Sequence, residues 1–247
     1  MDHYWRELPG PVWFSGAHVY RRFVQSVVGP AVAVELGAWK GRSTSFMGVE
    51  IANSGKPIRF TTVDHWRGSE GEELHDADQD VQSGRLYEVF LENIRPVAAY
   101  VNVIRDDSAA AAARFEDGSI DFLYIDASHS YEGVLRDLSA WWPKVKLGGL
   151  MAGDDWCFPD RGELGVRNAV RDFFRPSLSR LAIEPGSSPN EKWLQWSIVK
   201  CPDMPVSTAR GLKRSALWRR MVRRLTGRGP RQTGGQSPRR DSGTSHA

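Results

Sequence analysis

The sequence predicts an α/β fold, built on a mostly parallel seven-stranded sheet with helices on both faces and an antiparallel hairpin at the C-terminal end. Two observations support this fold class. Short apolar runs alternate with helical stretches from residue 31 onwards, which is typical of a parallel sheet covered on both faces. The last two apolar runs follow each other without room for a crossover helix, so they must pair antiparallel.

The individual elements follow from the spacing of apolar residues. Val19, Phe23 and Val27 recur four apart and predict an amphipathic helix that starts at Ala17 and ends before Gly29. The parallel strands are expected at 32–35, 59–63, 101–105, 120–125 and 149–153. The principal helices that follow the first glycine turn are expected at 84–94, 108–115 and 163–174. The closing strands, 180–184 and 193–200, are joined by the turn-rich sequence PGSSPN.

Residues 32–45, VAVELGAWKGRSTS, join a buried strand to a helix through a glycine turn. Gly37 and Gly41 let the backbone approach a ligand closely, and the N–H groups of the helix N-terminus face that ligand. A dinucleotide site would need glycine in place of Glu35, whose carboxylate repels a pyrophosphate but attracts an ammonium. The alternative is an ordinary strand-to-helix turn that requires glycine for its backbone.

Composition and charge divide the chain into three parts. Residues 1–30 form an arm and a helix, and the Trp- and Pro-rich arm either packs on the domain's own surface or forms a wall of the substrate site or a dimer contact. Residues 31–206 form the main domain. Residues 207–247 hold 11 Lys and Arg against one Asp, so this segment carries +10 and the rest of the chain −7.

The basic segment is expected to be largely disordered and to be either a solvated tail or a contact for a polyanion or membrane surface. No apolar run approaches the ~20 residues of a membrane span. The first residues also lack the pattern of a signal peptide, which indicates a cytoplasmic protein.

The glycine turn resembles the first motif of class I S-adenosylmethionine (SAM) dependent methyltransferases, which have a Rossmann-like fold. The resemblance covers about residues 31–200 and implies a set of SAM-binding residues: Glu35, Gly37, Gly41, Ser43, Asp64, His65, Asp107, Ser108 and Asp126. Asp64 would hold the ribose, and His65 or Trp66 would pack on adenine. Asp107 and Ser108 match positions that contact the adenine edge, although Ser108 is equally suited to cap a helix.

Residues 121–155, DFLYIDASHSYEGVLRDLSAWWPKVKLGGLMAGDD, resemble a bacterial methyltransferase family that includes metal-dependent O-methyltransferases acting on sugars. Asp126, Asp154 and Asp155 follow adjacent strands, and three carboxylates packed together would raise one another's pKa values. A divalent cation removes this conflict, and oxygen ligands suit Mg²⁺. The alternative is that Asp154 and Asp155 cap the next turn.

Asp126 and His129 are the candidate catalytic residues. His129 lies three residues after Asp126 and is the expected general base, because an imidazole titrates near neutral pH. Two acceptor oxygens would bind the metal while His129 removes the proton of the attacking hydroxyl. The expected acceptor is a small molecule or oligosaccharide, namely a sugar or glycoside such as a precursor of a methylated mannose or glucose polysaccharide.

Trp66, Tyr131 and Trp156 are the candidate acceptor contacts. Trp5 and Trp13, like Trp66 and Trp156, offer flat apolar faces of the kind that stack on the C–H face of a pyranose. Residues 68–82 have no strong period and are expected to form a mobile lid. The family resemblance implies a homodimer. Two other functions stay open: an O-methyltransferase for a catechol or polyketide hydroxyl, and a non-catalytic SAM-binding regulator.

Overall fold

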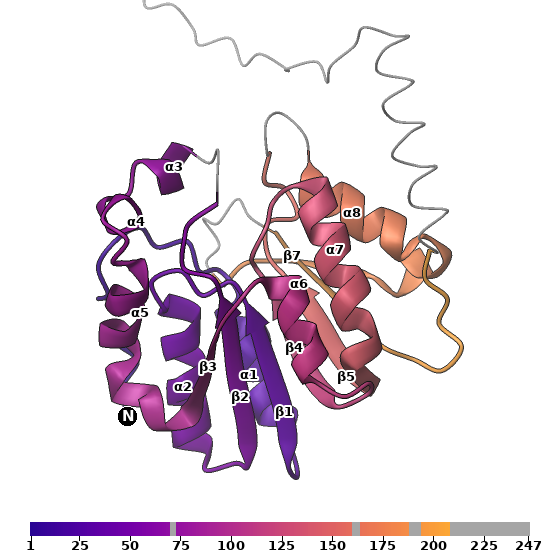
Figure 1. The fold of residues 1–247 in the computed structure, drawn as a ribbon. Helices are drawn as coiled ribbons and strands as arrows, with labels where there is room; N and C mark the ends of the chain where they lie inside the picture. The colour runs from indigo at the N-terminus through magenta and orange to yellow at the C-terminus, as the bar shows by residue number, and fades with distance from the viewer. Residues whose placement is uncertain (70–72, 160–163, 188–193, 208–247) are drawn as a thin grey trace, which may run out of the picture. The chain divides into compact units, whose positions relative to one another are not determined.

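The computed structural model describes residues 1–69, 73–159, 164–187 and 194–207. This part of the chain contains a sheet of seven strands in the order β3-β2-β1-β4-β5-β7-β6 (Figure 1). Neighbouring strands from β3 to β5 pair parallel, and β7 pairs antiparallel with both β5 and β6. The predicted fold class, including the antiparallel C-terminal hairpin, is confirmed.

The strands are β1 (Ala31–Leu36), β2 (Ile58–Asp64), β3 (Val101–Arg105), β4 (Ile120–Ile125), β5 (Val145–Gly153), β6 (Ala182–Pro185) and β7 (Leu194–Val199). The α-helices are α1 (Ala17–Ser26), α2 (Arg42–Ser54), α3 (Glu73–Asp76), α4 (Gln79–Gln82), α5 (Leu86–Ile94), α6 (Ser108–Ala111), α7 (Tyr131–Trp141) and α8 (Gly165–Phe173). Short 3₁₀ helices are η1 (Arg95–Tyr100), η2 (Ala112–Arg114), η3 (Trp142–Lys144) and η4 (Arg175–Arg180).

Two elements differ from the sequence expectation. The helix expected at 108–115 divides into α6 and η2. Strand β5 begins at Val145 rather than at 149, and its pairing with β4 shifts register between Ile120 and Phe122. Gly148 and Gly149 interrupt the apolar run at this irregularity, which hides the first part of the strand in the sequence.

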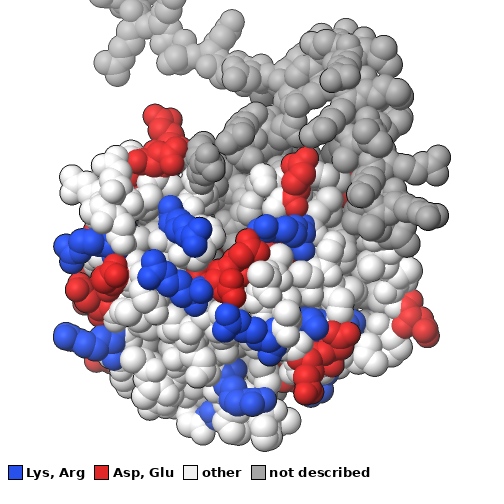
Figure 2. Space-filling view, in the orientation of Figure 1, with Lys and Arg blue, Asp and Glu red and all other residues white. Residues whose placement is uncertain are grey.

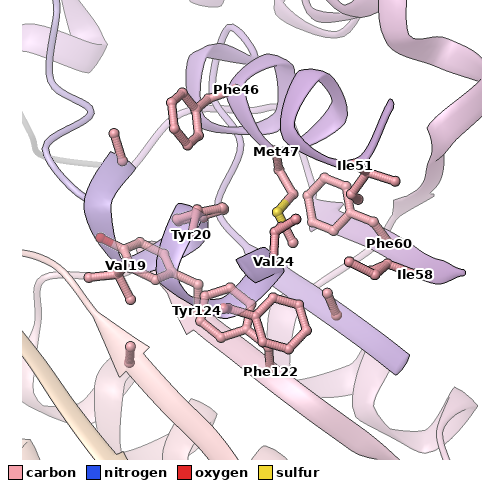
Figure 3. Close-up of a cluster of buried hydrophobic side chains, with 14 of the residues drawn as sticks. Val19, Tyr20, Val24, Phe46, Met47, Ile51, Ile58, Phe60, Phe122 and Tyr124 are labelled. Atoms are coloured by element: carbon pink, nitrogen blue, oxygen red, sulfur yellow. The ribbon is translucent and has the colours of Figure 1, made fainter. Parts of the chain in front are cut away.

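Helix α1 covers one face of the sheet, and α6 and α7 cover the other (Figure 1). The apolar stripe of α1 packs on β4: Phe23 stacks on Phe122 at 4.6 Å between ring centroids, and Tyr20 lies 4.7 Å from Tyr124 (Figure 3). Trp5 of the N-terminal arm is buried in the same cluster. The part of the arm around Trp5 therefore packs on the domain's own surface, which agrees with the first of the two interpretations.

Residues Met1–Thr208 group into one compact unit. Acidic and basic side chains are interspersed over the face shown in Figure 2. Among the described residues, no helix combines the length and the apolar character needed to cross a membrane. The basic segment predicted at 207–247 lies, after Ser207, outside the residues that the structure describes.

The carboxyl group of Asp137 on α7 is fully buried. One of its oxygens accepts a 2.6 Å hydrogen bond from Ser108 Oγ, and the other has no hydrogen-bond partner among the described residues. Burial raises the pKa of Asp137 from 3.8 to about 6. Since the folded protein holds this proton more tightly than the unfolded chain, the group's stabilising contribution is present below pH 4 and is lost as the pH rises through 6.

We predict that Asp137→Asn, which cannot ionise, removes this pH dependence. Relative to the wild type, the free energy of unfolding of the variant should increase by up to roughly 3 kcal/mol between pH 4 and pH 7. Urea unfolding at half-unit pH intervals measures this difference, with Glu116→Gln as a control at an exposed carboxylate. A difference that stays constant over this range would show that Asp137 does not titrate there.

Candidate active site

The turn after β1 passes directly against the end of β4. Gly37 has φ +85° and Gly41, the N-cap of α2, has φ +87°, a backbone region that disfavours residues with a side chain. A Cβ atom on Gly37 would lie 1.9 Å from the carbonyl oxygen of Asp126. Only glycine fits between these two strand ends.

Asp64, at the end of β2, holds the turn in place. Its Oδ2 accepts the backbone N–H groups of Ala38 at 2.9 Å and Trp39 at 3.0 Å, and its Oδ1 accepts that of Trp66 at 2.7 Å. These bonds fix Trp39 at φ +48°. One lone pair of Oδ1 is not used by these bonds, so the predicted contact of Asp64 with a ribose hydroxyl stays a prediction. The side chain of His65 is 42% exposed beside it.

Glu35 lies beneath the turn and is fully buried. Its carboxylate accepts hydrogen bonds from the hydroxyl groups of Tyr20 at 2.9 Å, Thr44 at 2.5 Å and Thr62 at 2.7 Å. Burial raises the pKa of Glu35, and the hydroxyl donors counteract part of that rise. Glu35 thus joins α1, β1, β2 and α2, and its predicted contact with SAM stays a prediction.

Asp107 and Ser108 follow β3. Asp107 is the N-cap of α6, accepting the N–H of Ala110 at 3.0 Å, and it pairs with Arg136 at 2.9 Å. Ser108 donates to Asp137 instead. The helix cap is therefore Asp107 and not Ser108.

Three side chains meet beyond the ends of β4 and β5. Asp126, His129 and Asp155 each offer a ligand atom within 4.8 Å of those of the others. His129 Nε2 lies 2.9 Å from Asp155 Oδ2. Burial, then the charges of Asp155 and Asp154, raise the pKa of Asp126 well above its usual range. The cluster combines mutually repelling acids with a titratable base, a combination found at functional sites.

Asp154 accepts hydrogen bonds from the protein at both oxygen atoms of its carboxylate. Its Oδ2 accepts the Ser15 hydroxyl at 2.7 Å, and its Oδ1 accepts the Gln195 amide at 2.5 Å and the Asp155 N–H at 2.7 Å. Burial, then the charge of Asp155, raise its pKa to about 7. The trio brought together is therefore Asp126, His129 and Asp155, whereas metal ligation by Asp154 stays a prediction.

A cavity of about 220 Å³ opens between the arm, the glycine turn, α3 and this cluster. The described residues that line it are Pro11, Trp13, Phe14, Gly37, Ala38, Trp39, Lys40, Arg42, Ser43, Leu74, His75, Asp126, Ala127, His129, Asp154, Asp155 and Phe158. Residues 73–82 of the expected lid form α3 and α4, and α3 supplies Leu74 and His75.

The three predicted acceptor contacts are not among these lining residues. Trp66 is buried against Phe90 and donates its indole N–H to the carbonyl of Trp39. Tyr131 donates its hydroxyl to Asp172 at 2.8 Å, and Trp156 is buried. The contact of these three side chains with an acceptor stays a prediction.

Sequence reasoning missed Trp39, His75 and Phe158, whose rings do line the cavity. The signal for Trp39 was present, since a tryptophan inside a glycine turn has no helix or strand face to pack on. His75 and Phe158 lie in segments without an apolar period, so nothing in the sequence distinguished them.

Residues 34–156 match the family model described as a methyltransferase domain. Among solved structures, the chain is similar to the calicheamicin methyltransferase CalS11 at 16% identity, covering 74% of this chain and 77% of that one, with a TM-score of 0.53. It is similar to the O-methyltransferase NovP at 18% identity, 75% and 80% coverage and a TM-score of 0.51. It is also similar to cofactor-bound Rv0187 from MTB at 15% identity, covering 79% of this chain and 84% of that one, with a TM-score of 0.52. At such identities, these likenesses show the fold.

We predict that Gly37→Ala displaces the end of β4 and weakens binding of SAM, the ligand that the turn predicts, at least tenfold. Calorimetric titration with SAM measures the affinity, and circular dichroism confirms folding. Gly55→Ala is the matched control: Gly55 also has positive φ (+62°), but nothing lies within 4 Å of its added Cβ, so only backbone strain of ~1 kcal/mol is expected. Equal SAM affinities in both variants would contradict the close approach.

Proposed function

Given that the chain is a SAM-dependent methyltransferase, we propose that it methylates a hydroxyl group of a sugar or glycoside, with His129 as the general base. The observation that carries the proposal is the cluster of Asp126, His129 and Asp155 at one corner of the cavity, because it supplies a base and oxygen ligands next to the glycine turn. The name of one structure with this fold, the O-methyltransferase NovP, favours an oxygen acceptor.

The donor set fits a divalent cation such as Mg²⁺. Asp126 and Asp155 offer hard oxygen ligands. Burial, and then the charges of Asp155 and Asp154, raise the pKa of Asp126, and a bound cation would offset both by stabilising the carboxylate. When bound, the cation supplies Lewis acidity that makes a neighbouring hydroxyl easier to deprotonate. Asp126 and Asp155 would hold it, together with Asp154 if that side chain exchanges its present hydrogen bonds.

The contact of His129 with Asp155 supports its role as the base. Asp155 lies 2.9 Å from its Nε2, so the carboxylate orients the ring and stabilises the imidazolium that forms. In the proposed step, the acceptor oxygen forms a bond to the methyl carbon as the carbon–sulfur bond of SAM breaks. The hydroxyl proton passes to His129, and SAM leaves as the neutral thioether S-adenosylhomocysteine (SAH).

We also propose two interactions of the full chain. The first is the homodimer implied by the family resemblance, and the second is a contact of the basic tail with a polyanion or membrane surface. Neither affects the chemistry described above.

We predict that His129→Ala lowers kcat at least 100-fold, since a positioned general base contributes that much. The affinity for SAM should change less than twofold. SAH release measures turnover, and calorimetry measures binding. His18→Ala removes a histidine that is not among the described cavity residues and should keep kcat within threefold. Similar kcat values for the two variants would remove His129 from the proposal.

We also predict that chelation abolishes activity and that added Mg²⁺ restores it. Asp155→Ala should lose metal binding, measured by calorimetry with MgCl₂, while it retains SAM binding. Full activity in excess EDTA would exclude the metal but would leave the test of His129 intact.

A further inference from the structure

The N-terminal arm forms one wall of the cavity, and Arg42 at the start of α2 fixes it there. The Arg42 guanidinium donates to the backbone carbonyl groups of Leu8, Gly10 at 2.6 Å and Pro11 at 3.0 Å. Its Nη1 also donates to the carbonyl of Trp5. Because the arm is held by its backbone, the side chains beyond Pro11 keep a defined position over the site.

Three rings from separate elements meet at this wall. Trp13 comes from the arm, Trp39 from the glycine turn and His75 from α3, and all three line the cavity. Trp39 and His75 are stacked, with centroids 4.2 Å apart and planes at 18°. Trp13 lies 5.5 Å from Trp39 and 5.4 Å from His75. Trp13 keeps 37% of its surface exposed, so part of this ring cluster remains available to a ligand.

The positive charges of the cavity are already engaged. Among the described residues that line the cavity, the lysine and arginine side chains are those of Lys40 and Arg42. Lys40 is only 8% exposed and pairs with Asp78 at 2.7 Å and Asp80 at 2.6 Å. The guanidinium of Arg42 donates its hydrogen bonds to backbone carbonyl groups of the arm.

Carboxylates outnumber these cations around the cavity. Asp126, Asp154 and Asp155 line it, while Asp78 and Asp80 neutralise Lys40 from α4 and its N-cap. Even with a divalent cation held by Asp126 and Asp155, a diphosphate placed here would meet the carboxylate of Asp154 and no unpaired lysine or arginine in the described lining, so its desolvation would be costly. An uncharged ring meets no such penalty and gains contact with the aromatic wall.

We infer that the acceptor is an uncharged glycoside with an apolar ring face, and not a nucleotide-activated sugar. The inference rests on the proposed hydroxyl methylation and narrows its substrate class. In this arrangement the ring face of the acceptor lies on Trp13, Trp39 and His75. Trp13 is a specificity-determining residue, because the arm that Arg42 clamps holds its partly exposed ring at the wall of the cavity.

The test compares matched probes that share one sugar. The 4-nitrophenyl glycosides of mannose, glucose and rhamnose are each titrated against the corresponding nucleoside diphosphate sugar, by calorimetry, into the full chain with SAH and MgCl₂. Each glycoside that binds should have a Kd at least tenfold lower than its nucleotide counterpart. Trp13→Ala should raise the glycoside Kd at least fivefold, Trp13→Phe should restore it within twofold, and the Kd of SAH should be unchanged in both.

Tighter binding of a nucleotide sugar, no binding of any glycoside, or an unchanged glycoside Kd in Trp13→Ala would overturn the inference. Methyl transfer to the same probes, followed by SAH release, is measured separately. Glycoside binding without methylation of any hydroxyl would contradict the proposed function and leave the inference intact. Methylation of the nucleotide sugars in preference to the glycosides would contradict the inference alone.

Discussion

The close approach of Gly37 to the carbonyl of Asp126 is the contact on which the rest of the site depends. It brings the turn after β1 against the end of β4, so a ligand held by the turn lies beside the cluster of Asp126, His129 and Asp155. Asp64 holds the turn from above through backbone N–H groups, and Glu35 holds it from below through buried hydroxyl groups. A parallel sheet makes such a convergence possible because the carboxyl ends of its strands share one edge.

Several acids in the recognisable motifs are engaged by the protein itself. Glu35 joins four elements, Asp107 caps α6, and Asp154 ties Ser15 of the arm to Gln195 of β7. The carboxylates of Glu35 and Asp154 satisfy N–H or O–H groups that would otherwise be buried without partners, whereas Asp107 accepts an exposed N–H group. A motif can thus be a good guide to the fold while many of its polar atoms face the protein rather than the ligand.

The fold could be predicted from the sequence because the apolar runs mark the strands and the residues after them mark the strand ends. The parallel strands, the closing hairpin and the gathering of acids at one edge all follow from that pattern. The composition of the cluster did not follow, since Asp154 and Asp155 are adjacent and Asp155 has φ +61°, which sends consecutive side chains in directions that no periodicity encodes. The rings that line the cavity could not be predicted for a related reason. Trp39, His75 and Phe158 come from three segments that only the tertiary structure brings together.

The clamp made by Arg42 has an evolutionary consequence. Because the guanidinium donates only to main-chain carbonyl groups between Trp5 and Pro11, this hold does not depend on the exposed side chains of the arm, whereas Trp5 itself is buried in the core. Mutations at exposed arm positions such as Glu7 and Val12 can therefore accumulate without loosening the arm from the body of the protein. Selection for a new acceptor can remodel this wall one residue at a time, and protein engineers can use the same freedom, while the residues that perform the chemistry are left untouched.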